Sequence, residues 1–514
     1  MSIDEDSAFS SRIFQSITLP CGIIVQNRLV KVAMYEHLAS FYGGLPNDYH
    51  LRLYSEWAKH GWGMVVTGNV QVAKDHLTLG RDLVLPESLD SEELSEPFRK
   101  LAAVIHGVYQ PSIGSAGTLA HNKTLAIMQL NHPGRQSSNF IGGRLPFHAP
   151  LAPSSVPLVH GKKAGLTSSL LNLAMFQTPR AMTKADILAI IGRFVDGAVL
   201  AFRTGFDGIQ LHAAHGYLLA QFLSDKTNRR QDDYSSENAL NIIRVIVKRI
   251  RMSTPKNFAI CIKMSAGDYK PEEHSLGEAG GRALEHLLGM ASWGLIDVIE
   301  ISGGDYEKPD FMLSSSKSSR QAFFARFSHQ ALKSLNSLRS SSTRPLPLIL
   351  LTGGLRTPAL LCSALASNDA NLLGIGRGSV VCPALPSVIR TRLRDLQRWG
   401  DVPFQAEPIL QNGWILEYPP FLWVLGLVPK IQLIGAGINM AWYIVAMRRI
   451  ACDTVAPGCL RPPYEIGGLQ SVFWMWVWMS RSRNGNSKLK LLALCIRVFS
   501  LLFVSTLIAY LLAY

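Results

Sequence analysis

Short, almost wholly apolar runs alternate with amphipathic stretches along most of the chain. Eight of these runs are rich in β-branched residues and have the length of a buried strand. They are Leu29–Met34, Gly63–Val70, Leu125–Leu130, Gly208–Ala213, Phe258–Ser265, Val298–Gly304, Pro347–Gly354 and Asn371–Gly378. Strands that are apolar on both faces are typical of a parallel sheet covered by helices, so the pattern predicts repeated β/α units.

The segments between most of these runs have helical periodicity. They are Pro97–Gln110, Lys184–Thr204, Asn238–Arg251, Glu278–Trp293, Ser318–Leu338 and Pro358–Ser367. Eight units of this kind predict an α/β fold of the (β/α)8 TIM-barrel class rather than a doubly wound open sheet. We expect the barrel to occupy residues 1–400, followed by a C-terminal extension over 401–488 and a transmembrane tail over 489–514.

Polar side chains follow three of the predicted strands where each strand ends. Gln129 ends the third strand, His212, His215 and Tyr217 follow the fourth, and Lys263 lies on the fifth. Catalytic residues of such barrels gather at this carboxyl end. Two imidazoles can hydrogen-bond one carbonyl or nitro oxygen, and a nearby phenol can donate a proton. The alternatives are structural histidines or a metal site, and no motif supplies a third metal ligand.

Two glycine-rich turns follow the last two strands. Gly353 and Gly354 follow the seventh strand, and Gly376 and Arg377 end the eighth. Glycine lets backbone N–H groups approach a phosphate, and an arginine can bind it bidentately. The pair of turns therefore predicts a phosphate site, with simple tight turns as the alternative.

The segment Gly205–Ser224 resembles the signature of the Old Yellow Enzyme family, the FMN-dependent NADH:flavin oxidoreductases. Further segments resemble motifs of the same family or of a fungal and bacterial subgroup. They are Asn27–Lys31, Gln129–Arg135, Glu300–Glu307, Arg320–Phe324, Thr352–Gly354 and Gly374–Arg377. The resemblance extends from Ile13 to Leu396.

The resemblance implies FMN at the mouth of the barrel and a hydride that passes from NAD(P)H through the flavin. By position, His212 and His215 match the pair that holds the substrate oxygen, and Tyr217 matches the proton donor. The implied function is reduction of the activated C=C of an α,β-unsaturated carbonyl compound. A flavin-linked dehydrogenase or isomerase on the same fold, or a catalytically silent membrane-anchored scaffold, remains as an alternative.

The resemblance also assigns the residues that bind the flavin. These are Ala33, Met34, Tyr35, Gln129, Lys263, Gly353, Gly354, Gly376 and Arg377. Gln129 matches a contact to the pyrimidine edge, and Lys263 stands where the family has a basic residue near flavin N1. Tyr35 departs from the family's usual Thr or Cys, so its bulkier phenol must point elsewhere or reshape the pocket. The stretch Asp233–Ala239 lacks the family's Gly-Gly and Arg, so its local geometry is expected to differ.

Composition narrows the classes of partner and cofactor. The formal charge is +14, but the basic residues are scattered, which argues against a nucleic-acid partner and fits anionic ligands or a membrane surface. The seven cysteines form no C-x-x-C pair, so no zinc ribbon or iron–sulfur cluster is expected.

The last segment, Leu491–Tyr514, is apolar except for Arg497. As a helix it would be roughly 36 Å long, enough to cross a membrane. Basic residues precede it and no charge follows, which predicts a tail anchor with the barrel in the cytosol, inserted after translation into the endoplasmic reticulum. The alternative is a helix buried against the barrel or in a homodimer. A second apolar stretch, Phe421–Met447, contains Lys430, and we favour its packing on the barrel over a second span.

Overall fold

The computed structural model describes most of the chain from residue 12 onward. The described residues are 12–109, 124–158, 175–266, 278–303, 318–339, 344–392, 404, 432–452, 466 and 468–477. The predicted tail lies outside them. Among the helices within these ranges, none combines the length and the apolar character needed to span a membrane.

Eight parallel strands close into a barrel in the described part of the chain. In chain order they are β3 (Leu29–Lys31), β4 (Met64–Gln71), β6 (Leu125–Asn131), β9 (Gly208–Ala213), β10 (Ala259–Ser265), β11 (Val298–Ser302), β12 (Leu348–Thr352) and β13 (Leu372–Ile375). The last strand pairs with the first, with Leu373 opposite Leu29, and this pairing closes the barrel. All eight predicted strands are therefore confirmed, with ends that differ by a few residues.

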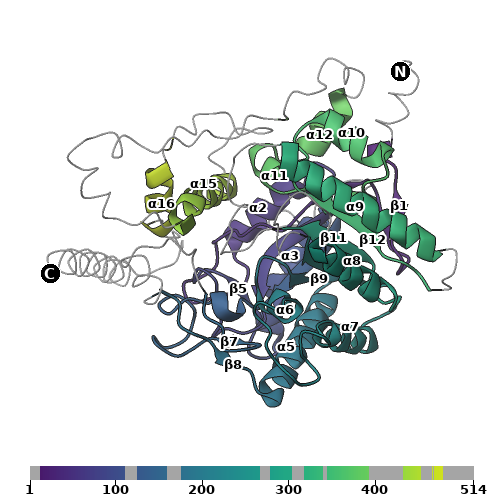
Figure 1. Cartoon of the computed structure of the whole chain (residues 1–514). Coiled ribbons are helices and arrows are strands. Elements are labelled where there is room, and N and C mark those ends of the chain that lie inside the picture. Colours follow the sequence, from purple (N-terminus) through teal and green to yellow (C-terminus); the bar gives the residue numbers. More distant parts are fainter. Residues whose placement is uncertain are drawn as a thin grey trace, which may run out of the picture. The chain divides into compact units, whose positions relative to one another are not determined.

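Helices surround the strands, as the alternating pattern predicts (Figure 1). They include α2 (Asp48–Ala58), α3 (Glu92–Ile105), α5 (Lys184–Arg203), α7 (Asn241–Ser253), α8 (Glu278–Ala291), α9 (Ser318–Arg339) and α10 (Pro358–Ala366). The prediction for α3 began too late. The helix begins before Pro97, because the Ser91 hydroxyl caps it by accepting a hydrogen bond from the Leu94 N–H at 3.3 Å.

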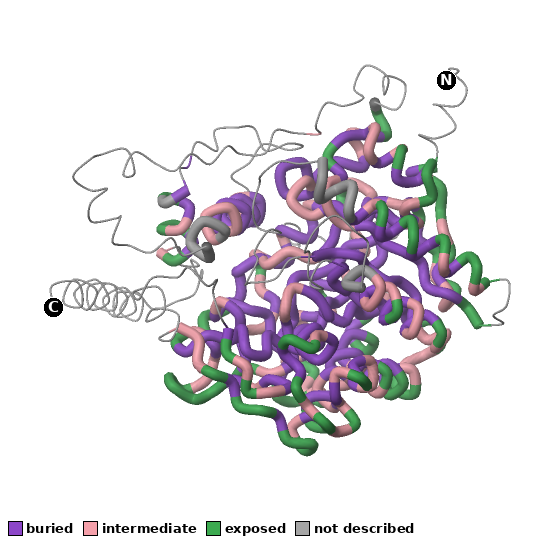
Figure 2. The backbone as a smooth tube through the Cα atoms, in the orientation of Figure 1, coloured by how far each residue is buried: buried purple, intermediate pink, exposed green. Residues whose placement is uncertain are grey.

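A small hairpin closes the amino-terminal end of the barrel. It consists of β1 (Ile17–Thr18) and β2 (Ile24–Val25), and its Leu19 and Val25 belong to one apolar cluster with Val30, Met64 and other residues near the strand starts. The barrel interior is buried throughout, while the exposed residues lie on the outer helices and loops (Figure 2). With this end filled by apolar side chains, the carboxyl end is left for chemistry.

Shorter elements lie in the loops at the carboxyl ends of the strands. These are β5 (Leu83–Val84), η1 (Gly134–Gln136), β7 (Leu151–Ala152), β8 (Arg180–Ala181), α6 (Leu218–Leu223) and α11 (Arg377–Val381). The helix α12 (Leu385–Arg392) follows α11, and its Ser387 hydroxyl donates to the His60 carbonyl ahead of β4. The strands β7 and β8 pair in parallel, so the long segment after β6 contains a small sheet of its own.

The C-terminal extension contains the helix α15 (Gln432–Ala451), which contacts α2 and α11. Its residues 441–447 are buried. The described part of the second apolar stretch therefore packs on barrel helices, as we favoured. A second unit begins at Phe473, so the second half of α16 (Gly468–Val477) belongs to it.

Candidate active site

The candidate catalytic residues lie in one tight segment at the carboxyl end of β9. His212 is on the strand, His215 follows in a left-handed backbone conformation with φ of 59°, and Gly216 continues the turn with φ of 71°. Tyr217 is the N-cap of α6. A non-glycine residue with positive φ is strained, and such strain is concentrated at functional sites. The turn folds His215 and Tyr217 back towards His212.

The two imidazoles meet through one nitrogen each. His212 Nε2 lies 3.0 Å from His215 Nδ1, and the rings are nearly perpendicular at 88°. The outer nitrogen of His215, Nε2, lies 3.1 Å from Ser302 Oγ on β11. The centroids of the His212 and Tyr217 rings are 4.7 Å apart. The structure therefore brings together all three residues of the predicted catalytic set.

Burial decides the charge of His212. The residue is 4% exposed, and burial, with His215 and then Lys263 nearby disfavouring a further positive charge, holds its pKa well below the usual value. The ring is therefore neutral at pH 7 and carries one N–H. Which nitrogen holds that proton determines what His212 can donate.

Lys263 lies on β10 within the same end of the barrel and is buried. Its Nζ is 3.0 Å from Glu300 Oε1 on the neighbouring β11, where the two residues are also in register. Gln210 Nε2 donates to the other carboxylate oxygen, Glu300 Oε2, at 2.8 Å. The predicted cation is thus held in a buried ion pair whose partner the sequence analysis did not identify.

Gln129 projects from β6 beside Asn69 on β4. Its Nε2 donates to Asn69 Oδ1 at 2.6 Å, and the same oxygen lies 3.0 Å from His212 Nδ1. The other Gln129 atom, Oε1, is buried and has no hydrogen-bond partner among the described residues. Such an acceptor fits the N–H of a flavin pyrimidine ring, so Gln129 suits the contact that the resemblance implies.

The two glycine-rich turns lie on adjacent strands. Thr352 on β12 is in register with Gly374 on β13, which places the two following turns next to each other. Gly353 and Gly354 adopt φ of 120° and 75°, a region that side chains disfavour. Thr352 Oγ1 is buried and has no hydrogen-bond partner within the described chain. This orphan hydroxyl and the two turns fit a phosphate group.

The second turn has a different form from the first. Gly376 is the N-cap of α11, and Arg377 is the first residue of that helix and is half-buried. These two residues, with Gly353 and Gly354, would hold the phosphate of FMN, as the sequence predicts.

The loop after β3 contains the other predicted flavin contacts, Ala33, Met34 and Tyr35. The Tyr35 hydroxyl donates to Asp82 Oδ2 at 3.3 Å, so this phenol has a partner within the loop that follows β4. Two residues further, His37 Nδ1 lies 2.6 Å from Arg448 Nη2 of α15. The C-terminal extension therefore supports the loop that carries Tyr35.

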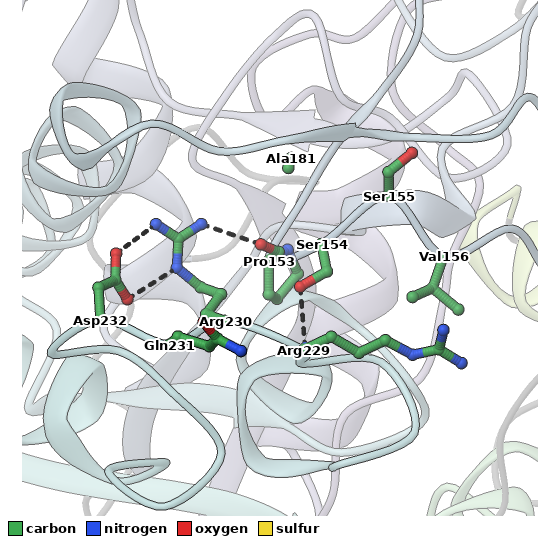
Figure 3. Close-up of a pocket in the computed structure, with 9 residues that line it drawn as sticks. All are labelled: Pro153, Ser154, Ser155, Val156, Ala181, Arg229, Arg230, Gln231 and Asp232. Carbon is green, nitrogen blue, oxygen red and sulfur yellow. Dashed lines mark hydrogen bonds and ion pairs between the residues drawn. The ribbon is translucent and has the colours of Figure 1, made fainter.

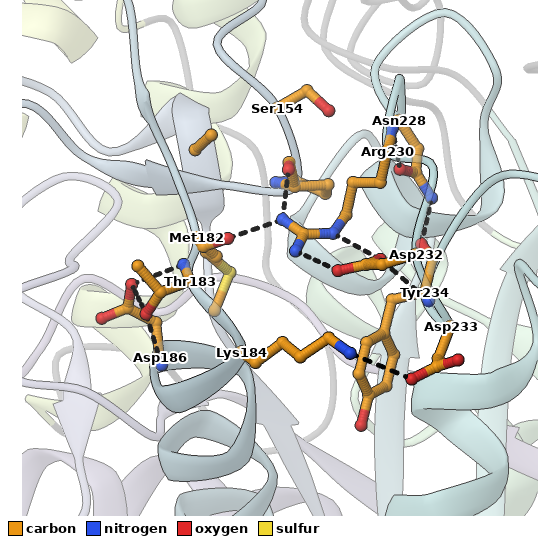
Figure 4. Close-up of polar contacts among 12 residues, drawn as sticks. Ser154, Met182, Thr183, Lys184, Asp186, Asn228, Arg230, Asp232, Asp233 and Tyr234 are labelled. Carbon is orange, nitrogen blue, oxygen red and sulfur yellow. Dashed lines mark hydrogen bonds and ion pairs between the residues drawn. The ribbon is translucent and has the colours of Figure 1, made fainter.

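A surface pocket of about 620 Å3 contains none of the predicted site residues. It lies between the loop after β7 and the loop after α6 (Figure 3). Arg230 lines the pocket, but its guanidinium is already paired within the protein. Its Nη2 lies 2.6 Å from Asp232 Oδ2, and its Nη1 donates to the Met182 carbonyl (Figure 4). This arginine ties the loop to β8, so we place the chemistry at the histidine pair. Within the described residues, no group of three or more metal-ligating side chains is present.

Comparison with known protein families decides the assignment. The model of the protein family described as "NADH:flavin oxidoreductase / NADH oxidase family" matches residues 12–395 of this chain. The chain belongs to this family. Membership implies FMN as the cofactor and a reduced nicotinamide as the reductant, and it makes the protein an oxidoreductase enzyme of the Old Yellow Enzyme type.

Two fungal proteins are among the relatives of this chain. The chain is 36% identical over 411 residues to "NADH-dependent flavin oxidoreductase iliE" of Neonectria sp. (strain DH2), covering 78% of this chain and 50% of that relative. It is 32% identical over 448 residues to "NADH-dependent flavin oxidoreductase iccE" of Talaromyces variabilis, covering 85% of this chain and 97% of the relative. The chain therefore spans half the length of the first and nearly all of the second.

Solved structures of this type share the fold. The Old Yellow Enzyme homologue from Zymomonas mobilis superposes with a TM-score of 0.54 at 18% identity, covering 77% of this chain and 95% of that one. Morphinone reductase gives 0.54 at 16% identity, covering 74% and 89%. These likenesses support the barrel architecture.

Sequence reasoning missed three residues that contact the predicted ones: Asn69, Ser302 and Glu300. Asn69 lies near the end of its strand, where the rule that located Gln129 would also have found it. Ser302 and Glu300 belong to the segment Glu300–Glu307, whose family resemblance implies no role for either. Only the packed barrel shows which polar side chains of neighbouring strands meet.

Proposed function

We propose that this protein is an ene-reductase that passes a hydride from NAD(P)H through FMN to the activated C=C of an α,β-unsaturated carbonyl compound. The observation that carries the proposal is the pair of the buried His212 and the half-buried His215, with the Tyr217 ring beside His212. The family assignment supplies the flavin and the reductant.

The two histidines and Tyr217 have different roles in the proposed reaction. His212 and His215 place nitrogens within 3.0 Å of each other, so a substrate oxygen bound there replaces their mutual contact. Hydrogen bonds to that oxygen withdraw electrons from the conjugated bond and stabilise the negative charge that develops on it. When bound, FMN supplies the hydride to one carbon of that bond. Tyr217 donates a proton to the other carbon.

The remaining residues position the reactants. Lys263, held by Glu300, places a positive charge within the barrel, where it would stabilise an anionic reduced flavin. Burial of His212 and of Tyr217, which is 7% exposed, limits water at the reacting centre.

The test uses the purified full chain and its absorbance spectrum. It should be yellow, bleach under anaerobic conditions with NADH or NADPH, and regain its colour on addition of a conjugated enone, enal or nitroalkene. Analysis of product stereochemistry then defines the substrate class. Bleaching of the oxidised flavin by a saturated alcohol or amine, with no return of colour when an activated C=C compound is added, would indicate a dehydrogenase. A colourless protein that cannot be reconstituted with FMN would indicate a silent scaffold and refute the proposal.

We also propose that Leu491–Tyr514 anchors the enzyme in the membrane of the endoplasmic reticulum with the barrel in the cytosol. The support is the sequence alone: an apolar stretch of helical span length preceded by Arg481, Arg483, Lys488 and Lys490. In an alkaline carbonate extraction, the full chain should stay with the membranes, and a chain ending at Lys488 should be released with its flavin. Release of both would refute the anchor, and a full chain that is soluble and dimeric would favour a buried helix instead.

A further inference from the structure

The contact between Asn69 and His212 bears on which nitrogen of the catalytic ring carries its proton. Asn69 Oδ1 lies 3.0 Å from His212 Nδ1, and both side chains are buried. A neutral imidazole has one N–H and one lone pair, so an oxygen facing Nδ1 requires the proton on Nδ1. His212 Nε2 is then an acceptor.

The backbone fixes Asn69 in this position. The pairing of β4 with β6 shifts register between Val66 and Asn69, an irregularity that re-aims the side chains beyond it. The preceding Gly68 N–H donates to Glu36 Oε1 at 2.9 Å, which holds the strand at the shift. Asn69 is then directly opposite Gln129 on β6.

The hydrogen bonds that follow from an Nδ1–H tautomer run in one direction. Ser302 donates from its hydroxyl to His215 Nε2, His215 donates from Nδ1 to His212 Nε2, and His212 donates from Nδ1 to Asn69 Oδ1. In this arrangement only His215 offers an N–H at the place where a substrate oxygen binds. The two-donor clamp of the proposed function needs the opposite tautomer of His212.

A concerted reversal of two amides would provide that tautomer. If the Asn69 amide turns over, its Nδ2 takes the place of Oδ1 and donates to His212 Nδ1. If the Gln129 amide turns as well, its Oε1 faces Asn69 Nδ2 and accepts the second N–H. Gln129 Oε1 has no partner among the described residues. Turning the amide would move this oxygen from the flavin N–H to Asn69 Nδ2 and would leave Gln129 Nε2 facing a carbonyl oxygen of the same pyrimidine ring. In the second arrangement Asn69 Nδ2 would donate to both His212 Nδ1 and Gln129 Oε1, so each of these two acceptors would gain a donor.

We propose that Asn69 is a positioning residue whose amide selects the tautomer of His212: Nδ1–H in the ligand-free enzyme and Nε2–H when a substrate oxygen binds. This inference rests on the proposed function only for the second state, since the first concerns the free enzyme alone. Phenols serve as probes because their oxygen stands in for the substrate carbonyl oxygen.

The experiment measures the 15N chemical shifts of His212 in the FMN-loaded full chain, assigned by comparison with His212→Gln. In the wild type, Nδ1 should be protonated without ligand and unprotonated with a bound phenol. Asn69→Asp keeps an acceptor of the same shape that cannot donate, so Nδ1 should stay protonated in both states. Asn69→Leu removes the acceptor, so Nδ1 should be unprotonated even without ligand.

A second measurement is phenol affinity, followed by the perturbation of flavin absorbance. Asn69→Asp should weaken phenol binding about tenfold, the loss expected for one hydrogen bond. Asn131→Asp is the matched control, because Asn131 is equally buried and ends β6 but donates to Gln71 Oε1 at 3.1 Å. It should leave both the His212 shifts and the affinity within twofold of the wild type.

Two results overturn the inference. One is a ligand-free wild type in which His212 Nδ1 is unprotonated. The other is that Asn69→Asp and Asn69→Leu both show the same Nδ1 protonation as the wild type, with and without phenol. The tautomer of the ligand-free enzyme can be read whether or not the protein reduces enones. A failure of the proposed function, seen as no reduction of any activated C=C, is therefore distinguishable from a failure of this inference.

Discussion

Removal of the charge of Glu300 should strongly destabilise the protein. Lys263 Nζ and Glu300 Oε1 are 3.0 Å apart, and their side chains are 5% and 0% exposed. At an effective dielectric constant near 20, two charges at that distance attract by roughly 5 kcal/mol. Breaking a buried pair on one side typically costs about 3–5 kcal/mol, because the remaining charge stays buried without compensation. We expect Glu300→Gln to lower the free energy of unfolding by about 3–5 kcal/mol.

A surface pair of equal geometry provides the control. Lys59 Nζ also lies 3.0 Å from Glu56 Oε2, but these side chains are 50% and 25% exposed. Water screens such a pair, so Glu56→Gln should cost at most about 1 kcal/mol. Any difference between the two variants then reports burial rather than distance.

The assay is urea unfolding of the FMN-loaded protein at pH 7, followed by far-UV circular dichroism, with wild type and both variants measured in parallel. The double variant Lys263→Met, Glu300→Leu should recover part of the lost stability, because it removes both charges. Equal effects of Glu300→Gln and Glu56→Gln, or no recovery in the double variant, would refute the reasoning.

Three further outcomes follow from the same site. Tyr217→Phe should leave reduction of the flavin by NAD(P)H intact but slow its oxidation by an enone about 10²–10⁴-fold in stopped-flow measurements, and a defect in the first step alone would assign the phenol another role. Tyr35→Phe removes the 3.3 Å bond to Asp82, so urea unfolding should show a loss of about 1 kcal/mol while bound FMN is retained. Burial, and then His215, lower the pKa of His212, so on acidification this ring takes up a proton in the unfolded chain before it does so in the folded protein. The neutral ring therefore favours the folded state fully above the ordinary pKa of histidine, and this contribution falls as the pH drops below that pKa. His212→Gln should consequently flatten the decline of the urea midpoint between pH 7 and 5.

The barrel was predictable because its strands are continuous apolar runs, a pattern with few alternatives at this length. The α2 helix was not predicted, although Asn47 accepts hydrogen bonds from the backbone of Tyr49 and His50 and so marks the helix start. The catalytic segment was also predictable, because His212, His215 and Tyr217 lie close together in the sequence, directly after a predicted strand. Local patterns of this kind are visible without the fold.

Contacts between strands were beyond the reach of the sequence. Glu300 and Lys263 are on adjacent strands, but their pairing depends on the register of the barrel, which no local pattern encodes. The direction of the Tyr35 hydroxyl likewise depends on Asp82, 47 residues away. Asn69 stands near a strand end, where the sequence rule applies, but the face its side chain takes depends on the register shift before it, which no local pattern shows.

The contact of Arg448 with His37 has a consequence for the order of folding. The two residues are 411 positions apart, and the guanidinium is buried, which lowers its pKa to about 9. A ribosome releases the first barrel strand long before it releases α15, so the eight strands can close while the loop after β3 still lacks its final support. The mouth of the barrel should therefore be the last part of the nascent enzyme to acquire its shape, and ligand binding should begin only after α15 has docked.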